Sequence, residues 1–287
     1  QYFCGKSIQL STISNVGFVS NYQLSTSNYM TGIITLPLVS LRVSNTESSE
    51  LSTQLMFGER VEVFEVGERW LHVRNLTDNC IGWADTKMVQ ILSAEEEKRL
   101  SNSPVFCIPV PFLVCDKPVS GQKMYLPGGS FFPSYNYGRC IIDDEIYQIN
   151  MSSNQPKPKS LSQEITNNAL QYLNAPYLWG GKSILGMDCS GLVQVVFAMS
   201  GIQLPRYAAH QVEVGRVIDF LFEAQPGDLV FFENPEREIV HVGILLNTRQ
   251  IIHVSGCVKI DPIDSQGIVS TKTGDYTHTL RVIKRVI

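Results

Sequence analysis

The chain has 287 residues, of which 44% are hydrophobic and 17% are charged, and its formal net charge is −4 at pH 7. This length suits two or three domains, and the composition is that of an ordinary globular protein. No basic block is present, which argues against nucleic-acid binding, and no apolar run reaches the roughly 18 residues of a membrane-spanning helix.

Neither the N-terminal residues nor the cysteines indicate the cellular compartment of the protein. The chain begins at Gln1, and no charged segment followed by an apolar core comes after it. We expect a periplasmic or secreted protein if a targeting segment was removed before Gln1, and a cytoplasmic one otherwise. The 7 cysteines are scattered without CxxC pairs, so neither a zinc pattern nor a disulfide framework is predicted.

The first half of the chain is predicted to be all β. Residues 1–34 are polar and stay unassigned. In residues 35–95, alternating apolar residues form strand-like runs that are separated by glycines and an Asp-Asn turn, as expected for a small barrel. Residues 96–150 are again rich in strand-like segments and turn residues, and we predict a second, divergent barrel there. The predicted strands of the first barrel are 38–43, 60–66, 70–73 and 81–84.

The pattern changes after a polar, proline-containing stretch at residues 151–160, which we interpret as a linker. Ser160 and Gln163 form a capping box, and apolar residues recur at helical spacing from there until Pro176. A glycine-rich loop, a helical run over 191–199 and several strands follow. Residues 161–287 are therefore predicted to be a separate α+β domain.

Cys189 is the one cysteine whose neighbours suggest chemistry. Asp188 is a good N-cap for the helix that follows, which places Cys189 in its first turn. There, free backbone N–H groups and the helix dipole favour a thiolate and offer donors to an oxyanion. The alternative is a buried structural cysteine beside a cap.

A nucleophilic cysteine needs a base, and two histidines lie in neighbouring strand-like runs. His241 belongs to the run 239–246 and His253 to the run 250–254. A three-residue loop at 247–249 would pair residues of equal parity and put both imidazoles on one sheet face, about 5–8 Å apart. A two-residue loop would put them on opposite faces. On one face, they suit the base and the orienter of a cysteine nucleophile.

The remaining histidines and a metal site are less favoured. A metal ion would need a third ligand beside His241 and His253. Cys189 could supply it, but no tight cluster of His, Cys and Asp supports this, so no metal or other cofactor is expected. His72 and His278 have no neighbours that suggest chemistry, and His210 stays ambiguous.

Four motifs in order give the C-terminal domain its resemblance to a family. They are PYLWGG…DCSG within 176–206, QPGDLVFF at 225–232, HVGILL at 241–246 and IIHVSG at 251–256. The domain is similar to the NlpC-type peptidoglycan cysteine peptidases, which implies a papain-like fold behind two SH3-like barrels. The resemblance implies Cys189 as nucleophile, His241 as base and His253 as third polar member.

The resemblance also implies substrate-binding residues. Tyr177, with Trp179 in the same motif, is expected to shape the cleft, and Asp188 and Ser190 are expected to contact the dipeptide beside the nucleophile. Arg206 is expected in the same subsite. Tyr207, however, stands where the subgroup has Asp, and Cys80 stands where Tyr is common. These departures leave the subsite contacts open.

The barrels narrow the resemblance to the γ-D-glutamyl-L-diamino acid endopeptidases, also called dipeptidyl-peptidase VI. This implies hydrolysis of the bond between γ-D-Glu and Lys or diaminopimelate in a murein-derived peptide with a free N-terminal L-Ala. Glu50 lines up with an acid that pairs with that free amine. We expect a monomer with this peptide as its partner. Two alternatives stay open: a peptidase or amidase of intact peptidoglycan, and a non-catalytic wall-binding SH3-like protein.

Overall fold

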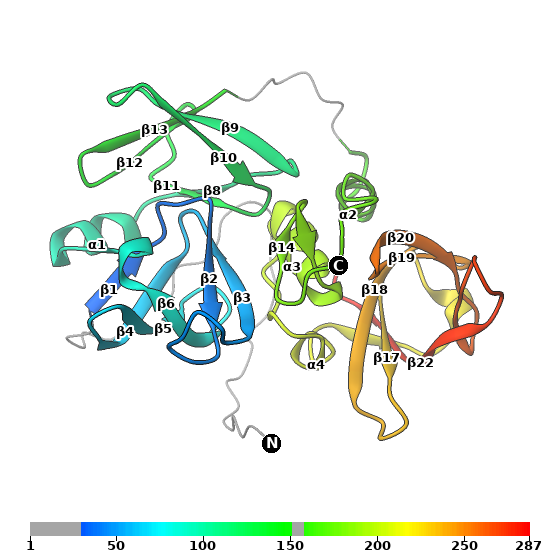
Figure 1. Ribbon diagram of the computed structural model, residues 1–287. Coiled ribbons are helices and arrows are strands. Elements are labelled where there is room, and N and C mark those ends of the chain that lie inside the picture. The colour runs from blue at the N-terminus through cyan, green and yellow to red at the C-terminus, as the bar shows by residue number, and fades with distance from the viewer. Residues whose placement is uncertain (1–29, 151–157) are drawn as a thin grey trace.

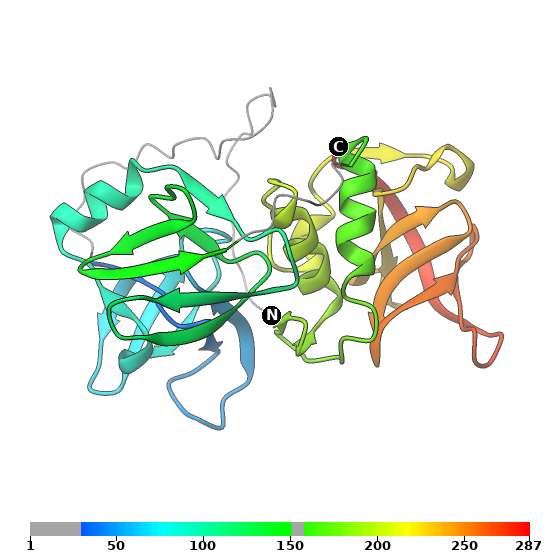
Figure 2. The ribbon, with the colours of Figure 1, turned by 90° about the horizontal axis from the view of Figure 1, so that it is seen from above.

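The computed structural model describes residues 30–150 and 158–287. Two β-rich units formed by the first half of the chain lie on one side of a pair of helices, and a larger sheet lies on the other side (Figures 1 and 2). The predicted linker, apart from residues 158–160, lies outside the described residues, as do residues 1–29 of the unassigned N-terminal segment.

The first unit is a seven-stranded sheet with the order β3-β2-β6-β5-β4-β1-β7. The four predicted strands are confirmed within two residues at each end, because their alternating residues enter one core around Val39, Leu41 and Val61. Three strands, β1, β3 and β7, were not predicted, and β1 falls in the segment left unassigned. The elements are β1 Met30–Ile33, β2 Leu38–Arg42, β3 Leu51–Met56, β4 Arg60–Val66, β5 Trp70–Asn75, β6 Ile81–Asp85, the 3-10 helix η1 Thr86–Met88 and β7 Gln90–Ile91.

The second unit begins with a helix, α1, that was not predicted. Ser93 caps it by accepting a hydrogen bond from the N–H of Glu96, and three acidic residues occupy its first turn. The strands form a four-stranded sheet, β10-β9-β13-β12, and a separate pair, β11-β8. A second barrel therefore stays a prediction. The elements are α1 Ala94–Ser101, β8 Val105–Cys107, β9 Phe112–Lys117, β10 Gln122–Pro127, β11 Phe131–Pro133, β12 Arg139–Ile142 and β13 Glu145–Ile149.

The third unit is α+β, as expected. Its main sheet has the order β16-β22-β17-β18-β19-β20, with β21 beside β22, and helices α2 and α3 cover one face. The capping box at Ser160 is confirmed, but α2 ends at Leu170, earlier than predicted. The elements are α2 Leu161–Leu170, β14 Lys182–Ser183, β15 Gly186–Met187, α3 Cys189–Met199, α4 Ala208–Gln211, β16 Arg216–Ile218, η2 Leu221–Glu223, β17 Leu229–Glu233, β18 Ile239–Asn247, β19 Gln250–Ser255, β20 Cys257–Pro262, β21 Gly267–Val269 and β22 Tyr276–Arg285.

Strand β3 of the first unit docks on the third unit through three consecutive side chains. The Ser52 hydroxyl lies 2.7 Å from the Tyr207 hydroxyl, and Thr53 Oγ1 accepts a 2.7 Å hydrogen bond from Arg206 Nε. Gln54 Oε1 accepts a 2.8 Å bond from the backbone N–H of Lys182. Each bond joins residues more than 120 positions apart, so this strand fixes how the two units sit together.

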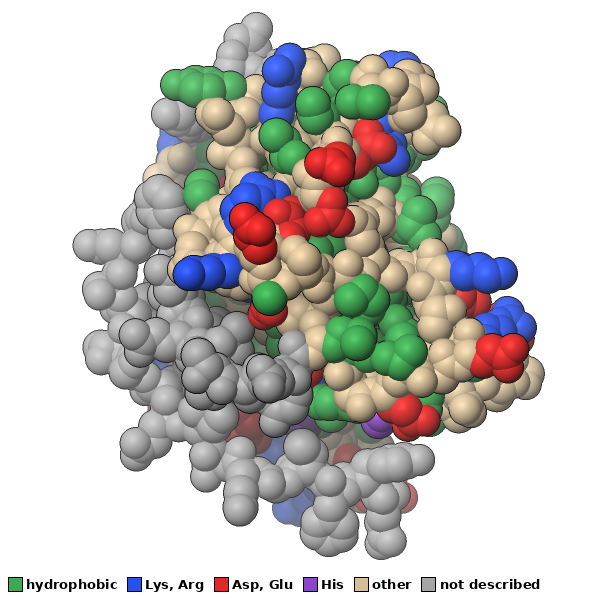
Figure 3. All heavy atoms as spheres, turned by 90° about the vertical axis from the view of Figure 1, so that its left-hand side faces the viewer, with side chains coloured by type: hydrophobic (Ala, Val, Ile, Leu, Met, Phe, Trp, Pro, Cys, Tyr) green, Lys and Arg blue, Asp and Glu red, His purple; other side chains and the backbone are tan. Residues whose placement is uncertain are grey.

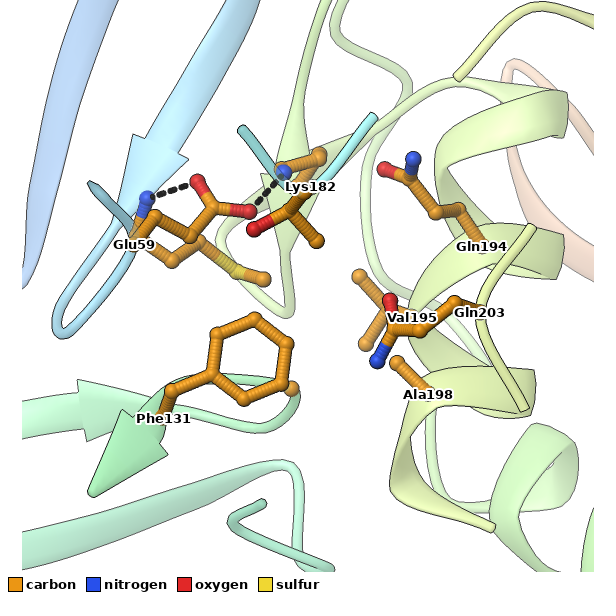
Figure 4. Close-up of a pocket in the computed structure, with 10 residues that line it drawn as sticks. Glu59, Phe131, Lys182, Gln194, Val195, Ala198 and Gln203 are labelled. Carbon is orange, nitrogen blue, oxygen red and sulfur yellow. Dashed lines mark hydrogen bonds and ion pairs between the residues drawn. The ribbon is translucent and has the colours of Figure 1, made fainter. Parts of the chain in front are cut away.

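A buried ion pair extends the same interface. Lys182 Nζ lies 3.1 Å from Glu59 Oε1, and both side chains are almost fully buried. Glu59 also accepts a hydrogen bond from the N–H of Met56, so both carboxylate oxygens are bonded. Figure 4 shows this pair beside a small pocket that Phe131 and α3 complete. The pocket is an interface feature, since none of the predicted catalytic side chains lines it.

The outer face of the first two units is mixed in charge. In Figure 3, acidic and basic side chains lie beside one another and are not gathered in blocks of one sign. This agrees with the small net charge of −4. No helix within the described ranges combines the length and the apolar character that crossing a membrane requires.

Candidate active site

Cys189 is the first residue of helix α3, as the sequence predicted. The Asp188 side chain caps the helix by accepting a 2.7 Å hydrogen bond from the N–H of Gly191. The thiol is half-buried, and the backbone N–H groups of Ser190 and Val242 hydrogen-bond to it. Because Val242 follows His241 in β18, the candidate nucleophile lies against the strand that carries the candidate base.

Asp188 also accepts hydrogen bonds from groups outside helix α3. Its carboxylate accepts hydrogen bonds from Arg206 at 2.6 and 2.9 Å and from the N–H of Gly180 at 2.8 Å. Arg206 is 1% exposed, and it also donates to Ser190 Oγ and Thr53 Oγ1. These four hydrogen bonds make Arg206 a support for the start of α3, and its predicted contact with substrate stays a prediction. Asp188 and Ser190 are buried in the same network.

The hairpin that carries the two histidines has a shorter loop than predicted, but both histidines still lie on one face of the sheet. Asn247 pairs with Gln250, so the loop has two residues, not three. A bulge between Leu245 and Asn247 adds one residue to β18 and restores the parity that the short loop would have lost. His253 consequently opposes Gly243, and His241 lies on the diagonal of the same face. Nε2 of His241 is 2.9 Å from Nδ1 of His253.

Asp261, on β20, is a member of the site that the sequence analysis missed. Its Oδ2 lies 3.0 Å from Nε2 of His253 and 2.9 Å from Nζ of Lys259, and Thr271 Oγ1 donates to Oδ1. Burial alone would raise the pKa of Asp261, but hydrogen bonds from Lys259, His253 and Thr271 lower it to about 2. The carboxylate is ionised, so Nε2 of His253 must donate to it.

This hydrogen bond fixes the tautomers along the chain of groups. With its proton on Nε2, neutral His253 presents an unprotonated Nδ1, which accepts the Nε2 proton of His241. Neutral His241 is then left with an unprotonated Nδ1. That nitrogen is the one available to take a proton from a nucleophile.

His278 was dismissed at the sequence level, and the structure places it against the candidate base. Its ring stacks on His241 with centroids 4.2 Å apart, and it lies edge-on to His253 at 5.6 Å. Burial and the neighbouring His253 lower the pKa of His278 to about 4. The residue lies on β22, on the far side of β17 from β18, so only the pairing of distant strands brings it here.

The thiol and the base are both neutral in the free enzyme. Burial and the charge of Asp188 raise the pKa of Cys189 to about 11, although N–H groups and Arg206 oppose the change. Burial, His278 and His253 hold the pKa of His241 well below its ordinary value. The N–H groups at the start of α3 lower the pKa of the thiol, as predicted, but desolvation outweighs them, so the net change does not favour a resting thiolate.

Three predicted residues remain, and their contact with a substrate stays a prediction. Tyr177 and Trp179 are largely exposed, and the backbone N–H of Tyr177 donates to Gly256 O, close to the end of β19. The Tyr177 phenol has a pKa raised by burial and by the nearby Asp188 and Cys189. Glu50 is exposed and directly precedes β3.

Two family models match the chain at these places. Residues 174–276, which hold Cys189, His241, His253 and Asp261, match the NlpC/P60 family. The chain therefore contains an NlpC/P60 domain, the domain of a family of cysteine peptidases. Residues 41–88 match the bacterial dipeptidyl-peptidase SH3 domain, so the first unit contains an SH3 domain.

Individual relatives agree with this assignment. The chain is 24% identical over 261 residues to a gamma-D-glutamyl-L-lysine dipeptidyl-peptidase of Bacillus cereus, covering 80% of the chain and 75% of the relative. It is 35% identical over 97 residues to the protein of the same name from Bacillus subtilis, covering 33% and 32%. A crystal structure of an NlpC/P60 family protein from Bacillus cereus matches with a TM-score of 0.73 at 19% identity, over 89% of this chain and 99% of that one. That similarity establishes a shared fold.

Proposed function

We propose that this NlpC/P60 protein hydrolyses the bond between γ-D-Glu and an L-diamino acid, Lys or diaminopimelate, in murein-derived peptides with a free N-terminal L-Ala. The product is L-Ala-D-Glu. The observation that carries the proposal is the docking of β3, the strand that directly follows Glu50, on the catalytic unit. Relatives named gamma-D-glutamyl-L-lysine dipeptidyl-peptidase support the reaction.

A chain of contacts links the residue after Glu50 to the residue before Cys189. Leu51, the neighbour of Glu50, packs so closely on Gly180 that a Cβ there would lie 2.7 Å from the Leu51 carbonyl oxygen. The N–H of Gly180 donates to Asp188, the residue before Cys189. Two bonds hold the loop before β3: Val43 N–H to Glu50 O at 3.1 Å, and Ser44 N–H to Ser49 Oγ at 2.8 Å.

A carboxylate beside the N-terminus of the bound peptide would select for an ammonium partner. The free amine of L-Ala would pair with Glu50, whereas an acylated L-Ala would desolvate the carboxylate without pairing it. Glycan-linked stem peptides carry such an acyl bond. The proposed substrates are therefore released peptides, not the intact wall.

The reaction is acyl transfer. Nδ1 of His241 takes the proton of the Cys189 thiol as the sulfur attacks the γ-carbonyl of D-Glu, and backbone N–H groups at the start of α3 stabilise the oxyanion. The imidazolium gives its proton to the leaving amine, and a thioester remains on Cys189. Water, deprotonated by His241, then hydrolyses the thioester and regenerates the thiol. His253 and Asp261 keep His241 in the productive tautomer.

Mass spectrometry of defined peptides tests the proposal. L-Ala-γ-D-Glu-L-Lys, its diaminopimelate analogue and the N-acetylated form of each are incubated with the protein and with Cys189→Ala. Release of L-Ala-D-Glu from the free-amine peptides alone, and only by the unmodified protein, is expected. Equal cleavage of acetylated peptides, or cleavage of polymeric peptidoglycan, would favour a wall endopeptidase instead. Binding to peptidoglycan without any turnover would favour the wall-binding alternative.

Glu50 has a matched control in its own loop. Glu50→Gln is expected to raise KM for the free-amine tripeptide by at least about tenfold, as expected for a lost charge-assisted contact. For the acetylated peptide the change should be small. Glu47→Gln removes an exposed carboxylate of the same loop, one that pairs with Arg69, and should leave both KM values unchanged. Equal changes with both peptides would remove Glu50 from the amine site.

A further inference from the structure

Three imidazoles converge in the candidate site. One ring nitrogen from each of His241, His253 and His278 lies within 4.8 Å of the other two. Within residues 30–150 and 158–287, no other group of three His, Cys, Asp or Glu side chains converges in this way. The proposed reaction uses His241 and His253, and it gives His278 no role.

The outer nitrogens of two of the three rings already have partners. Nε2 of His253 lies within hydrogen-bond distance of Asp261 Oδ2, at 3.0 Å. Nδ1 of His278 lies 2.9 Å from Thr277 Oγ1. A histidine that binds a metal through one nitrogen almost always uses the other in such a bond, and a carboxylate is a favoured acceptor. Nδ1 of His253 and Nε2 of His278 are the ring nitrogens that these two bonds leave for a metal ion.

We propose that His241, His253 and His278 bind one divalent transition-metal ion of the zinc class, and that this ion switches the peptidase off. Imidazole nitrogens are preferred zinc ligands, at bond lengths of about 2.0–2.1 Å. A tetrahedral site places ligand nitrogens roughly 3.4 Å apart. The 2.9 Å contact between His241 and His253 therefore opens by about half an ångström.

His278 makes the larger movement. Its ring now stacks on His241, with an angle of 28° between the ring planes, whereas ligands of one ion must each point a nitrogen at it. The ring has to turn about its side-chain bonds. His278 is the half-buried member of the three, so it turns without opening the core around the two buried histidines.

The inhibition follows from the tautomers, and this step rests on the proposed function. In the metal-free site, Nε2 of His241 carries a proton and Nδ1 is the base. A metal ion on Nε2 needs the lone pair there, so that proton moves to Nδ1. His241 can then no longer accept the proton of Cys189, and the thiol stays protonated. The ion blocks catalysis without touching the nucleophile.

Direct binding is measured first, on protein that lacks the thiol. Calorimetric titration of ZnCl2 into Cys189→Ala should show one site per chain. In the double variant Cys189→Ala/His278→Asn, zinc affinity should fall by at least about tenfold. Even the loss of a hydrogen-bond partner behind a metal-binding histidine lowers metal affinity 10–100-fold. Adding His210→Asn, which removes an exposed histidine of the same domain, should change nothing. X-ray absorption of the one-zinc wild-type protein should count three imidazole ligands, which requires no variant to fold.

Activity is measured next, each variant relative to its own metal-free rate. Zinc should lower kcat reversibly, EDTA should restore it, and His278→Asn should raise the half-inhibitory zinc concentration by at least about tenfold. Fewer than three imidazoles, or equal zinc affinity with and without His278, would overturn the site. A three-imidazole site whose occupation leaves kcat unchanged would overturn the switch and question His241 as base. If the metal-free protein has no peptidase activity, the proposed function is wrong, but the measured zinc affinity still tests the metal site.

Discussion

Nε2 of His253 lies 3.0 Å from Oδ2 of Asp261, so a buried carboxylate stands behind the two histidines of the site. Asp261→Asn would place an amide where Lys259 and Thr271 also need an acceptor, and one amide oxygen cannot serve them all. We expect kcat to fall at least about a hundredfold with little change in KM, because the tautomer of His241 is no longer fixed.

The control for this variant is Asp275→Asn, which changes an exposed carboxylate before β22. It should retain full kcat. An Asp261→Asn enzyme with wild-type kcat and an unchanged pH profile would show that His253 keeps its orientation without the charge.

Arg206 and Asp188 form a buried pair between the SH3 domain and the start of α3. Arg206→Met leaves the Asp188 carboxylate buried without its countercharge, and the expected loss is about 3–5 kcal/mol of unfolding free energy. Urea unfolding measures it. Arg216→Met, at an exposed arginine, should cost less than about 0.5 kcal/mol. A similar small loss at Arg206 would mean that water replaces the guanidinium.

Alanine substitutions at Gly180 and Gly201 separate two effects on stability: the contact of Gly180 with Leu51 in the SH3 domain, and the backbone strain that both positions share. Both have positive φ, 75° and 81°, so alanine is strained at either position. A Cβ on Gly180 would also strike the Leu51 carbonyl oxygen, whereas a Cβ on Gly201 would meet nothing within 4 Å. Gly180→Ala should therefore lose more stability than Gly201→Ala and should also raise KM for the free-amine tripeptide. Equal losses with equal KM would remove the Leu51 contact from substrate binding.

Glu96 gives the second unit a pH-dependent stability. Hydrogen bonds from Arg99 and from the N–H of Asp143 hold the pKa of Glu96 below its ordinary value. A depressed carboxyl pKa contributes stability above the unfolded value of 4.5, and the contribution disappears as pH falls through the lower, folded value.

Glu96→Gln should therefore destabilise the protein by about 1–2 kcal/mol at pH 7 and by progressively less below about pH 4. Thermal unfolding of both proteins from neutral to acidic pH tests this. Glu95→Gln, its exposed neighbour, should show no such pH trend. A difference that stays constant with pH would assign the effect to packing.

Local features of the site were predictable from the sequence. The capping role of Asp188, the position of Cys189 in the first turn and the shared sheet face of His241 and His253 depend on residues close together in the chain. The shared face, however, was predicted for the wrong reason. The bulge at Leu246 compensates for a shorter loop, and no residue pattern in the hairpin announces it.

The non-local member of the site was not predictable in this way. His278 comes from a strand that pairs with β17, some forty residues earlier in the chain, so only the order of the sheet brings it to the site. Asp261 is different, because it faces His253 across the β19–β20 hairpin, and the pairing of that hairpin was a local signal that the prediction did not use. The acidic first turn and Ser93 cap of α1 did give a local signal. It was overlooked because the surrounding segment is rich in strand-like residues.

The docking of β3 has a consequence for how such enzymes are inherited. Three neighbouring side chains, Ser52, Thr53 and Gln54, satisfy groups that belong to the catalytic half. Replacing the SH3 domain with one from an unrelated protein would remove the acceptors of the buried Arg206 Nε and of the Lys182 backbone N–H. We therefore expect productive recombination at this boundary to require both sides to be exchanged together.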